Sequence, residues 1–169
     1  MLIVRNEKPE DFAAIHEVNE KAFGRPSEAN LVDALRANGK VTISLVAVQD
    51  GKIIGHILFS PVTIESEKER FAAVGLAPMA VLPEHQNQGV GSNLVRAGLD
   101  ACRKSLHEIV VVLGHPAFYP RFGFTPASRH GIKSEYDVRD EVFMIIKLRE
   151  DALAGRSGIA KYQPEFNEV

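Results

Sequence analysis

The chain has 169 residues, the length of one domain of ordinary size. Hydrophobic residues make up 45% of it and charged residues 25%, which excludes intrinsic disorder and collagen-like sequence for the chain as a whole. The 20 Lys and Arg against 22 Asp and Glu give a net charge of -2, and this balance argues against a nucleic-acid-binding protein, which needs a basic face.

The cysteine content and the N-terminus bear on the compartment. One cysteine, Cys102, allows neither an internal disulfide nor a thiolate metal cage. Residues 1–12 lack the apolar core and cleavage site of a signal peptide, and no apolar run approaches the ~20 residues that span a bilayer. We therefore expect a cytoplasmic protein that binds no membrane.

The first half of the chain predicts a strand, two helices and a hairpin. Residues 2–4 form an apolar run that starts a strand, and Pro9-Glu10-Asp11 opens a helix because Pro and acids suit the first turn. A second helix starts near Ser27 and stops at Asn38-Gly39. Asp50-Gly51 separates two β-prone runs, 44–49 and 52–59, and this pattern predicts a hairpin. Pro61 ends or bends the second of these strands, and the alternative is that residues 62–64 continue it as an edge strand.

The second half predicts a strand–helix–strand crossover followed by short elements. A turn at 65–70 leads into a long apolar run, 71–82, then a polar loop, 84–91, and a helix. The β-branched run 108–113 predicts a buried strand. After it we expect one helical turn at 117–122 and a last strand at 142–148, and the final residues carry no pattern that predicts an element. The order predicts an α/β (α+β) fold with a mixed sheet, as one domain over 1–150 and a tail of unknown structure over 151–169.

The polar loop predicts an anion site. Gln86-Asn87-Gln88-Gly89-Val90-Gly91-Ser92 joins a strand to a helix, whose N-terminus presents unpaired N–H groups and a partial positive charge. Glycines let a ligand approach that backbone, although a glycine pair can also be a plain turn. No Lys precedes Ser92, so the loop is not a Walker motif, and Leu94 stands where a dinucleotide fingerprint needs a third glycine.

Two motifs in order resemble the GNAT superfamily of N-acetyltransferases. The text VLPEHQNQGVGS is similar to the signature V-x-P-x-x-[QR]-x-x-G-x-[GA], and Tyr119–Phe124 is similar to the Y-x-x-x-G-F element. The longer text around both, over residues 71–124, resembles the YhbS-like branch of that superfamily. The resemblance implies a sheet that splays at its centre, is flanked by helices and holds acetyl-CoA as co-substrate.

The resemblance also implies the cofactor-binding residues. The pantetheine arm would hydrogen-bond the main chain of Met79, Ala80 and Val81 as an added strand does, and we expect the side chains of these three residues in the core. The pyrophosphate would lie on the N–H groups of the loop, which are those of Asn87, Gln88, Gly89, Val90, Gly91 and Ser92.

The implied reaction transfers acetyl from the thioester to an amine of a small molecule or a protein. Tyr119 occupies the motif position that donates a hydrogen bond or proton to the departing thiolate, although it could also be a packing residue beside Phe118, Phe122 and Phe124. No ionisable residue occurs in 75–82, so the strand before the loop offers no general base for the amine proton. Glu28 is a candidate for this base, although an acid at this position also suits the first turn of a helix.

The sequence also bears on a metal site, on a non-catalytic alternative and on oligomeric state. The six histidines show no metal-ligand spacing, so we expect no metal. A non-catalytic module that binds or senses acyl-CoA is the alternative, because the strand before the loop carries no carboxylate. A homodimer is possible by analogy with the superfamily.

Overall fold

The structure is a computed structural model that describes residues 1–169. Its chain divides into two compact units. Unit 1 comprises Met1–Ser60, Ala77–Ala101 and Pro164–Val169, and unit 2 comprises Pro61–Leu76 and Cys102–Gln163.

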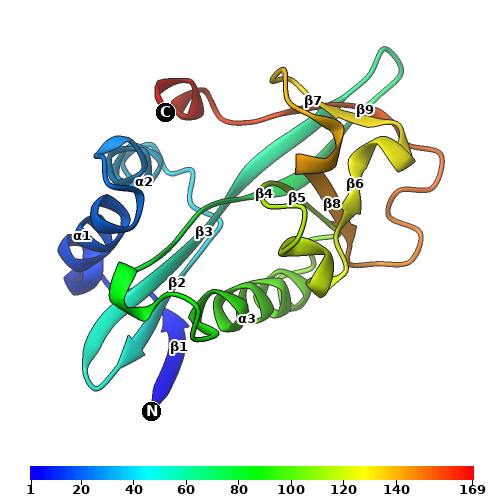
Figure 1. Ribbon diagram of the computed structural model, residues 1–169. Coiled ribbons are helices and arrows are strands. Elements are labelled where there is room, and N and C mark those ends of the chain that lie inside the picture. The colour runs from blue at the N-terminus through cyan, green and yellow to red at the C-terminus, as the bar shows by residue number, and fades with distance from the viewer. The chain divides into compact units, whose positions relative to one another are not determined.

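Nine strands and three α-helices make up the fold (Figure 1). The strands are β1 (Leu2–Asn6), β2 (Ile43–Gln49), β3 (Lys52–Glu65), β4 (Arg70–Val81), β5 (Ile109–Leu113), β6 (Thr125–Pro126), β7 (Ile132–Ser134), β8 (Phe143–Lys147) and β9 (Gly158–Lys161). The helices are α1 (Phe12–Phe23), α2 (Ser27–Ala37) and α3 (Val90–Lys104). Short 3-10 turns occupy Pro9–Asp11, Pro83–His85, Tyr119–Phe122, Ala127–His130, Asp140–Val142 and Pro164–Glu168. None of the helices has the length and apolar content needed to cross a bilayer.

Unit 1 is built on an antiparallel β1–β2–β3 meander. β1 pairs with β2, and β2 pairs with β3. Asp50 and Gly51 join β2 to β3 with φ values of 51° and 77°, both in the left-handed region that this tight turn requires. The predicted hairpin is thereby confirmed.

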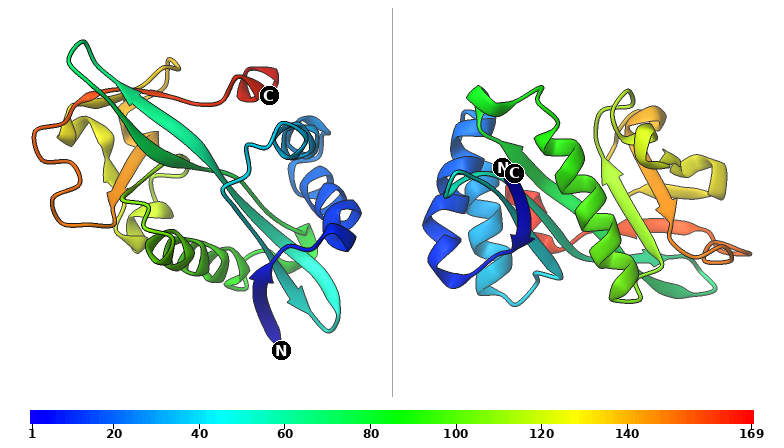
Figure 2. Two further views of the ribbon diagram at one scale, coloured as in Figure 1. Left: turned by 180° about the vertical axis from the view of Figure 1, so that it is seen from behind. Right: turned by 90° about the horizontal axis from the view of Figure 1, so that it is seen from below.

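Helices cover both faces of the unit 1 strands, as the view from below shows (Figure 2, right). On one face, Ile15 of α1 and Leu35 of α2 pack in one cluster with Leu58 of β3. On the other face α3 approaches closely, because a Cβ at Gly98 would lie 2.5 Å from Cε1 of Phe59. Leu58 and Phe59 are neighbours in β3, and successive strand side chains point to opposite faces.

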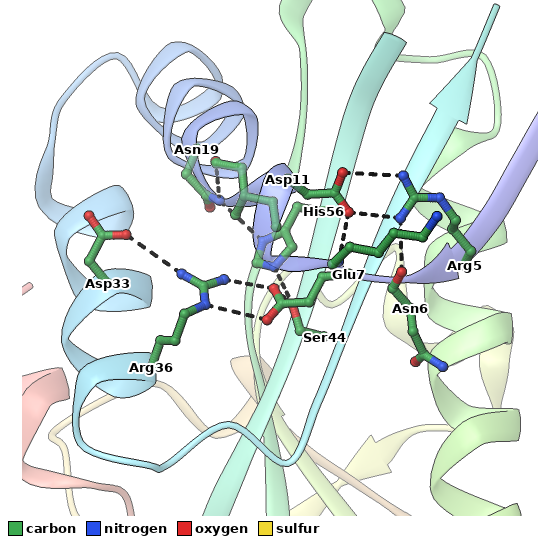
Figure 3. A network of polar contacts seen from close by, with 11 residues as sticks. Arg5, Asn6, Glu7, Asp11, Asn19, Asp33, Arg36, Ser44 and His56 are labelled. Carbon is green, nitrogen blue, oxygen red and sulfur yellow. Dashed lines mark hydrogen bonds and ion pairs between the residues drawn. The ribbon is translucent and has the colours of Figure 1, made fainter. Parts of the chain in front are cut away.

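A chain of polar contacts lies in unit 1 beneath α1 and α2 (Figure 3). Arg36 forms a bidentate ion pair with Glu7, and Ser44 Oγ donates to Glu7 Oε1 at 2.6 Å. The only proton of Ser44 is used there, so His56 Nε2, 2.8 Å away, must be the donor to Ser44 Oγ. His56 Nδ1 then accepts from Asn19 Nδ2 at 3.1 Å, which makes the buried imidazole neutral.

Unit 2 contains the parallel pair that the crossover predicts. Val74 and Gly75 of β4 pair with Val110 and Val111 of β5 in parallel, and β5 pairs with β8 antiparallel. β8 also pairs with β6, whereas β9 pairs with β3 antiparallel and with β7 in parallel. Parallel and antiparallel pairs in a sheet flanked by helices confirm the mixed α/β class.

The structure decides two segments that the sequence left open. β3 does not end at Pro61 but continues to Glu65, as the edge-strand alternative has it, because Pro61 lies between the residues that pair with β2, up to Phe59, and those that pair with β9, from Thr63 onward. A missing N–H therefore costs no ladder bond there. The tail 151–169, whose structure was not predicted, contains β9 and the 3-10 turn Pro164–Glu168.

Candidate active site

The end of β4 presents its main chain in two opposite directions. Leu82 N donates to Ile54 O at 2.9 Å, and Ala80 O lies 3.3 Å from the position of a Cβ on Gly55, so Ala80 and Leu82 face β3. Peptide groups alternate in direction along a strand, so those of Met79 and Val81 face away from β3. Met79 and the N–H of Val81 can therefore pair with an extended ligand, whereas the main chain of Ala80, which was predicted to bind the ligand too, faces β3.

The predicted phosphate loop follows in the same unit. After the 3-10 turn Pro83–His85, Asn87 and Gly89 take φ values of 63° and 86°, and α3 begins at Val90. Asn93 N donates to Gly89 O at 3.0 Å, so the preceding N–H groups of the first turn, those of Val90, Gly91 and Ser92, have no acceptor within the helix. No atom lies within 4 Å of a Cβ placed on Gly89. An open surface of amide donors at a positive helix end fits a diphosphate.

Two glutamine side chains fasten this loop to the chain before it. Gln86 Nε2 donates to Val81 O at 3.0 Å, and Gln88 Nε2 donates to Glu84 O at 3.3 Å. Gln86 thus links the loop to the β4 edge, a role that the sequence did not indicate beyond its place in the motif.

A glycine in β3 brings the end of β4 and the start of α3 together. A Cβ at Gly55 would lie 3.0 Å from Leu94 Cδ1, 3.2 Å from Val90 Cγ1 and 3.3 Å from Ala80 O. Both predicted parts of the cofactor site, the strand end and the helix start, therefore approach the same backbone position of β3.

Tyr119 lies in unit 2, at the start of the 3-10 turn Tyr119–Phe122, and is 7% exposed. Its ring meets Phe118 edge to face at 5.0 Å and Phe124 at 5.6 Å between centroids. The N–H groups of Phe118 and Tyr119 both donate to His115 O, at 3.1 and 3.3 Å. The aromatic cluster expected from the sequence is present, and it holds this phenol in a defined place.

Burial raises the pKa of Tyr119 to about 12. The phenol is therefore protonated at neutral pH and can donate a hydrogen bond. Complete proton transfer to a thiolate, whose acid has a pKa of ~8.5, would be uphill by about 5 kcal/mol. The environment thus suits a hydrogen-bond donor better than a full proton donor.

Glu28 is a helix N-terminal acid that is paired with a neighbouring arginine. It lies in the first turn of α2 and is 6% exposed, with its carboxylate held by Arg25 Nε at 3.0 Å and by Arg25 Nη2 at 2.5 Å. The Glu28 carboxylate raises the pKa of the Arg25 guanidinium through the hydrogen bond. This arrangement satisfies Glu28 without a catalytic task, and it identifies no base.

The titratable side chains offer neither a metal site nor a cysteine nucleophile. No group of three or more His, Cys, Asp and Glu residues could hold a metal ion. Cys102 is a buried free thiol whose pKa burial raises to about 12, the opposite of what a nucleophile requires.

Comparisons with known proteins agree with this geometry. The family model described as an acetyltransferase (GNAT) domain matches residues 3–127. YhbS of Escherichia coli K12, described as an uncharacterized N-acetyltransferase, is 37% identical over 167 residues, 98% of this chain and 99% of its own length. YjhQ of the same strain, with the same description, is 40% identical over 134 residues, 78% of this chain and 74% of its own length.

Solved structures show the same fold. The crystal structure of Escherichia coli YhbS in complex with CoA matches with a TM-score of 0.92, over 98% of this chain and 92% of that one. A GNAT-family acetyltransferase from Brucella melitensis in complex with acetyl-CoA is 34% identical and matches with a TM-score of 0.81, over 98% of each chain. Family model, sequence identity and fold agree with the two motifs, and the chain belongs to the GNAT family of N-acetyltransferases.

Proposed function

We propose that the protein is an acetyl-CoA-dependent N-acetyltransferase that moves the acetyl group directly from the thioester to an amine of a small molecule or a protein. The observation that carries the proposal is the set of amide donors at the start of α3, next to an open Gly89 and tied by Gln86 to the end of β4. Relatives that are 37% and 34% identical were crystallised with CoA and with acetyl-CoA.

Main-chain groups of unit 1 would hold acetyl-CoA. In this proposal the pantetheine amides pair with Met79 and Val81, with Ala80 between them. The diphosphate is bound by N–H groups of the loop, those of Asn87, Gln88, Gly89, Val90, Gly91 and Ser92. Of the three side chains expected in the core, Ala80 is buried, whereas Met79 and Val81 are half-buried, so the core expectation is wrong for these two.

The proposed reaction forms one C–N bond and breaks one C–S bond. A neutral amine attacks the thioester carbonyl carbon, and the oxyanion that forms is stabilised by a main-chain N–H near Val81. The C–S bond then breaks, CoA leaves as a thiolate, and the Tyr119 hydroxyl donates a hydrogen bond to that sulfur. The proton released by the amine passes to a base that we leave unassigned.

The test is thiol release from acetyl-CoA across a panel of small amines and lysine peptides. Wild type is expected to release CoA and to form a stoichiometric amount of acetylated amine with at least one acceptor. Tyr119→Phe keeps the ring and removes the hydroxyl, and we expect it to lower kcat by about tenfold or more with little change in the KM for acetyl-CoA.

The same experiment distinguishes the alternative. Tight binding of acetyl-CoA with no turnover on any amine would contradict the enzyme and favour a non-catalytic acyl-CoA sensor. A cytoplasmic location and a possible homodimer are part of the proposal and follow from the sequence arguments above.

A further inference from the structure

The Tyr119 ring packs against Gly114, a residue that in the sequence marks only the end of the strand before it. Gly114 directly follows β5, and its N–H donates to Val142 O at 2.9 Å. A Cβ placed on Gly114 would overlap Cε2 of Tyr119 and lie 2.7 Å from Cδ2. The phenol ring therefore fills the space that any side chain at residue 114 would take.

Space, and not backbone freedom, accounts for the glycine at this position. The φ of Gly114 is outside the left-handed region. Gly123, which ends the 3-10 turn that Tyr119 begins, differs in this respect, because its φ is +104°. The Gly114 backbone does not need the left-handed region that favours glycine, and the three atoms nearest to a Cβ at this position all belong to the Tyr119 ring.

The ring has no easy way to yield. Phe118 and Phe124 meet it nearly perpendicularly, at interplanar angles of 83° and 78°. The main chain below it is fixed, because His115 O accepts from both Phe118 N and Tyr119 N. A side chain at residue 114 would therefore tilt or lift the phenol and change where its hydroxyl points.

We propose that Gly114 is a positioning residue for Tyr119, because the absence of a side chain sets the place of the phenol hydroxyl. The consequence for catalysis rests on the proposed function, whereas the effect on the ring does not. The two are separated by one experiment that observes the ring directly and one that measures turnover.

The first experiment is fluorine NMR of protein labelled with 3-fluorotyrosine. The sequence has 3 tyrosines, so three resonances are expected, and the one lost in Tyr119→Phe is that of Tyr119. Gly114→Ala is expected to shift this resonance alone and to lower its ionisation midpoint, because a displaced ring is less buried. An unshifted resonance with an unchanged midpoint would overturn the proposal, whether or not the protein shows acetyltransferase activity.

The second experiment is a double-mutant cycle in kcat with Gly114→Ala and Tyr119→Phe. Gly114→Ala is expected to lower kcat by about tenfold in wild type and by less than about twofold in Tyr119→Phe, which has no hydroxyl to misplace. The KM for acetyl-CoA is expected to stay within about twofold in both backgrounds. Equal losses of kcat in the two backgrounds would overturn the positioning role.

A matched glycine in unit 1 controls for general damage. Gly98→Ala also sets a Cβ against a ring, that of Phe59, and its effect on kcat is expected to be the same with and without the Tyr119 hydroxyl. If Gly114→Ala does not fold, the same substitution is made in Tyr119→Ala, where the atoms that the new Cβ meets are absent, and it is expected to lower the free energy of unfolding no further than Tyr119→Ala alone. A further loss of stability in that background would show that the ring is not what requires glycine at residue 114.

Discussion

At the scale of single residues, the neutral state of His56 follows from the proton positions of its partners. Ser44 Oγ gives its proton to Glu7, and Asn19 Nδ2 gives one to His56, so both imidazole nitrogens are satisfied in the neutral form. Burial, with a smaller contribution from the charge of Arg36, lowers the pKa of His56 to about 3. Protonation would require an unpaired charge inside unit 1.

This depression of the pKa predicts loss of stability in mild acid. The unfolded chain protonates His56 below its ordinary pKa of ~6.5, whereas the folded chain does not until about pH 3, so the contribution of His56 is present above pH 6.5 and is lost as the pH falls through that window. Between pH 7 and 5 the loss is about 2 kcal/mol. Urea unfolding at both pH values measures it, with His56→Gln as the variant that lacks the titration. Equal pH dependence in the two proteins would contradict the prediction.

Gly89 allows a sharp test of the proposed diphosphate site. Its φ is +86° and the space beside it is open, so Gly89→Val sets an isopropyl group where the ligand would lie. We expect CoA affinity, measured by calorimetry, to fall by about tenfold or more, equal to about 1.4 kcal/mol.

The strain of a side chain at positive φ needs its own control in this test. Gly39, with φ +69° and equally open space, follows α2 in the same unit. Gly39→Val is expected to lower stability by a similar amount and to leave CoA affinity unchanged. Similar losses of affinity in both variants would mean that backbone strain, and not the ligand site, is responsible.

At the scale of elements, the sequence predicted those with strong local signals. Asp50-Gly51 between two β-prone runs predicted the hairpin, and the glycine-bearing loop before α3 predicted the helix start. The short strands β6, β7 and β9 were not predicted, because two to four residues carry no readable alternation and depend on partners far along the chain. Gly114 could not be recognised as crowded, since crowding is a property of the folded neighbour.

The C-terminal 3-10 turn is an element whose contribution can be measured. Glu165 accepts from Asn38 Nδ2 at 2.6 Å and lies 3.8 Å from Lys40 Nζ, while Phe166 packs against the apolar cluster of α1 and α2. Removal of residues 164–169 is expected to lower the free energy of unfolding by about 1–3 kcal/mol, mainly through the lost burial of Phe166. Denaturant unfolding of the truncated chain tests this. Glu165→Gln keeps the Phe166 ring, so we expect it to lower the free energy of unfolding by less than the truncation does. An equal loss would mean that the Glu165 carboxylate, and not Phe166, accounts for the stabilisation.

At the scale of the whole molecule, fold class and family were predictable because two motifs stood in order, one inside the strand–helix–strand crossover and one directly after it. The acceptor and the base were not, since no residue of the chain carries a pattern specific to one amine. The anion site of the loop was predicted from its own residues and the role of Tyr119 from the resemblance, and the two lie in different units of the structure.

Ligand binding should be visible in the stability of the whole chain. A ligand that binds only the folded state at about 100 times its Kd adds about 2.7 kcal/mol, which raises the Tm of a chain this long by roughly 5–10 °C. We expect CoA to produce such a shift in a thermal melt. NAD is expected to produce none, because the loop lacks the third glycine of a dinucleotide site. The reverse pattern would contradict the proposed cofactor.

The two units are interleaved along the polypeptide. Unit 1 is assembled from three separate stretches of chain and unit 2 from two, and both β3 and β4 pass from one unit into the other. A single genetic crossover between related genes could therefore never transfer either unit intact. Recombination within this lineage would exchange whole chains or surface loops, and the two units would have to evolve as partners.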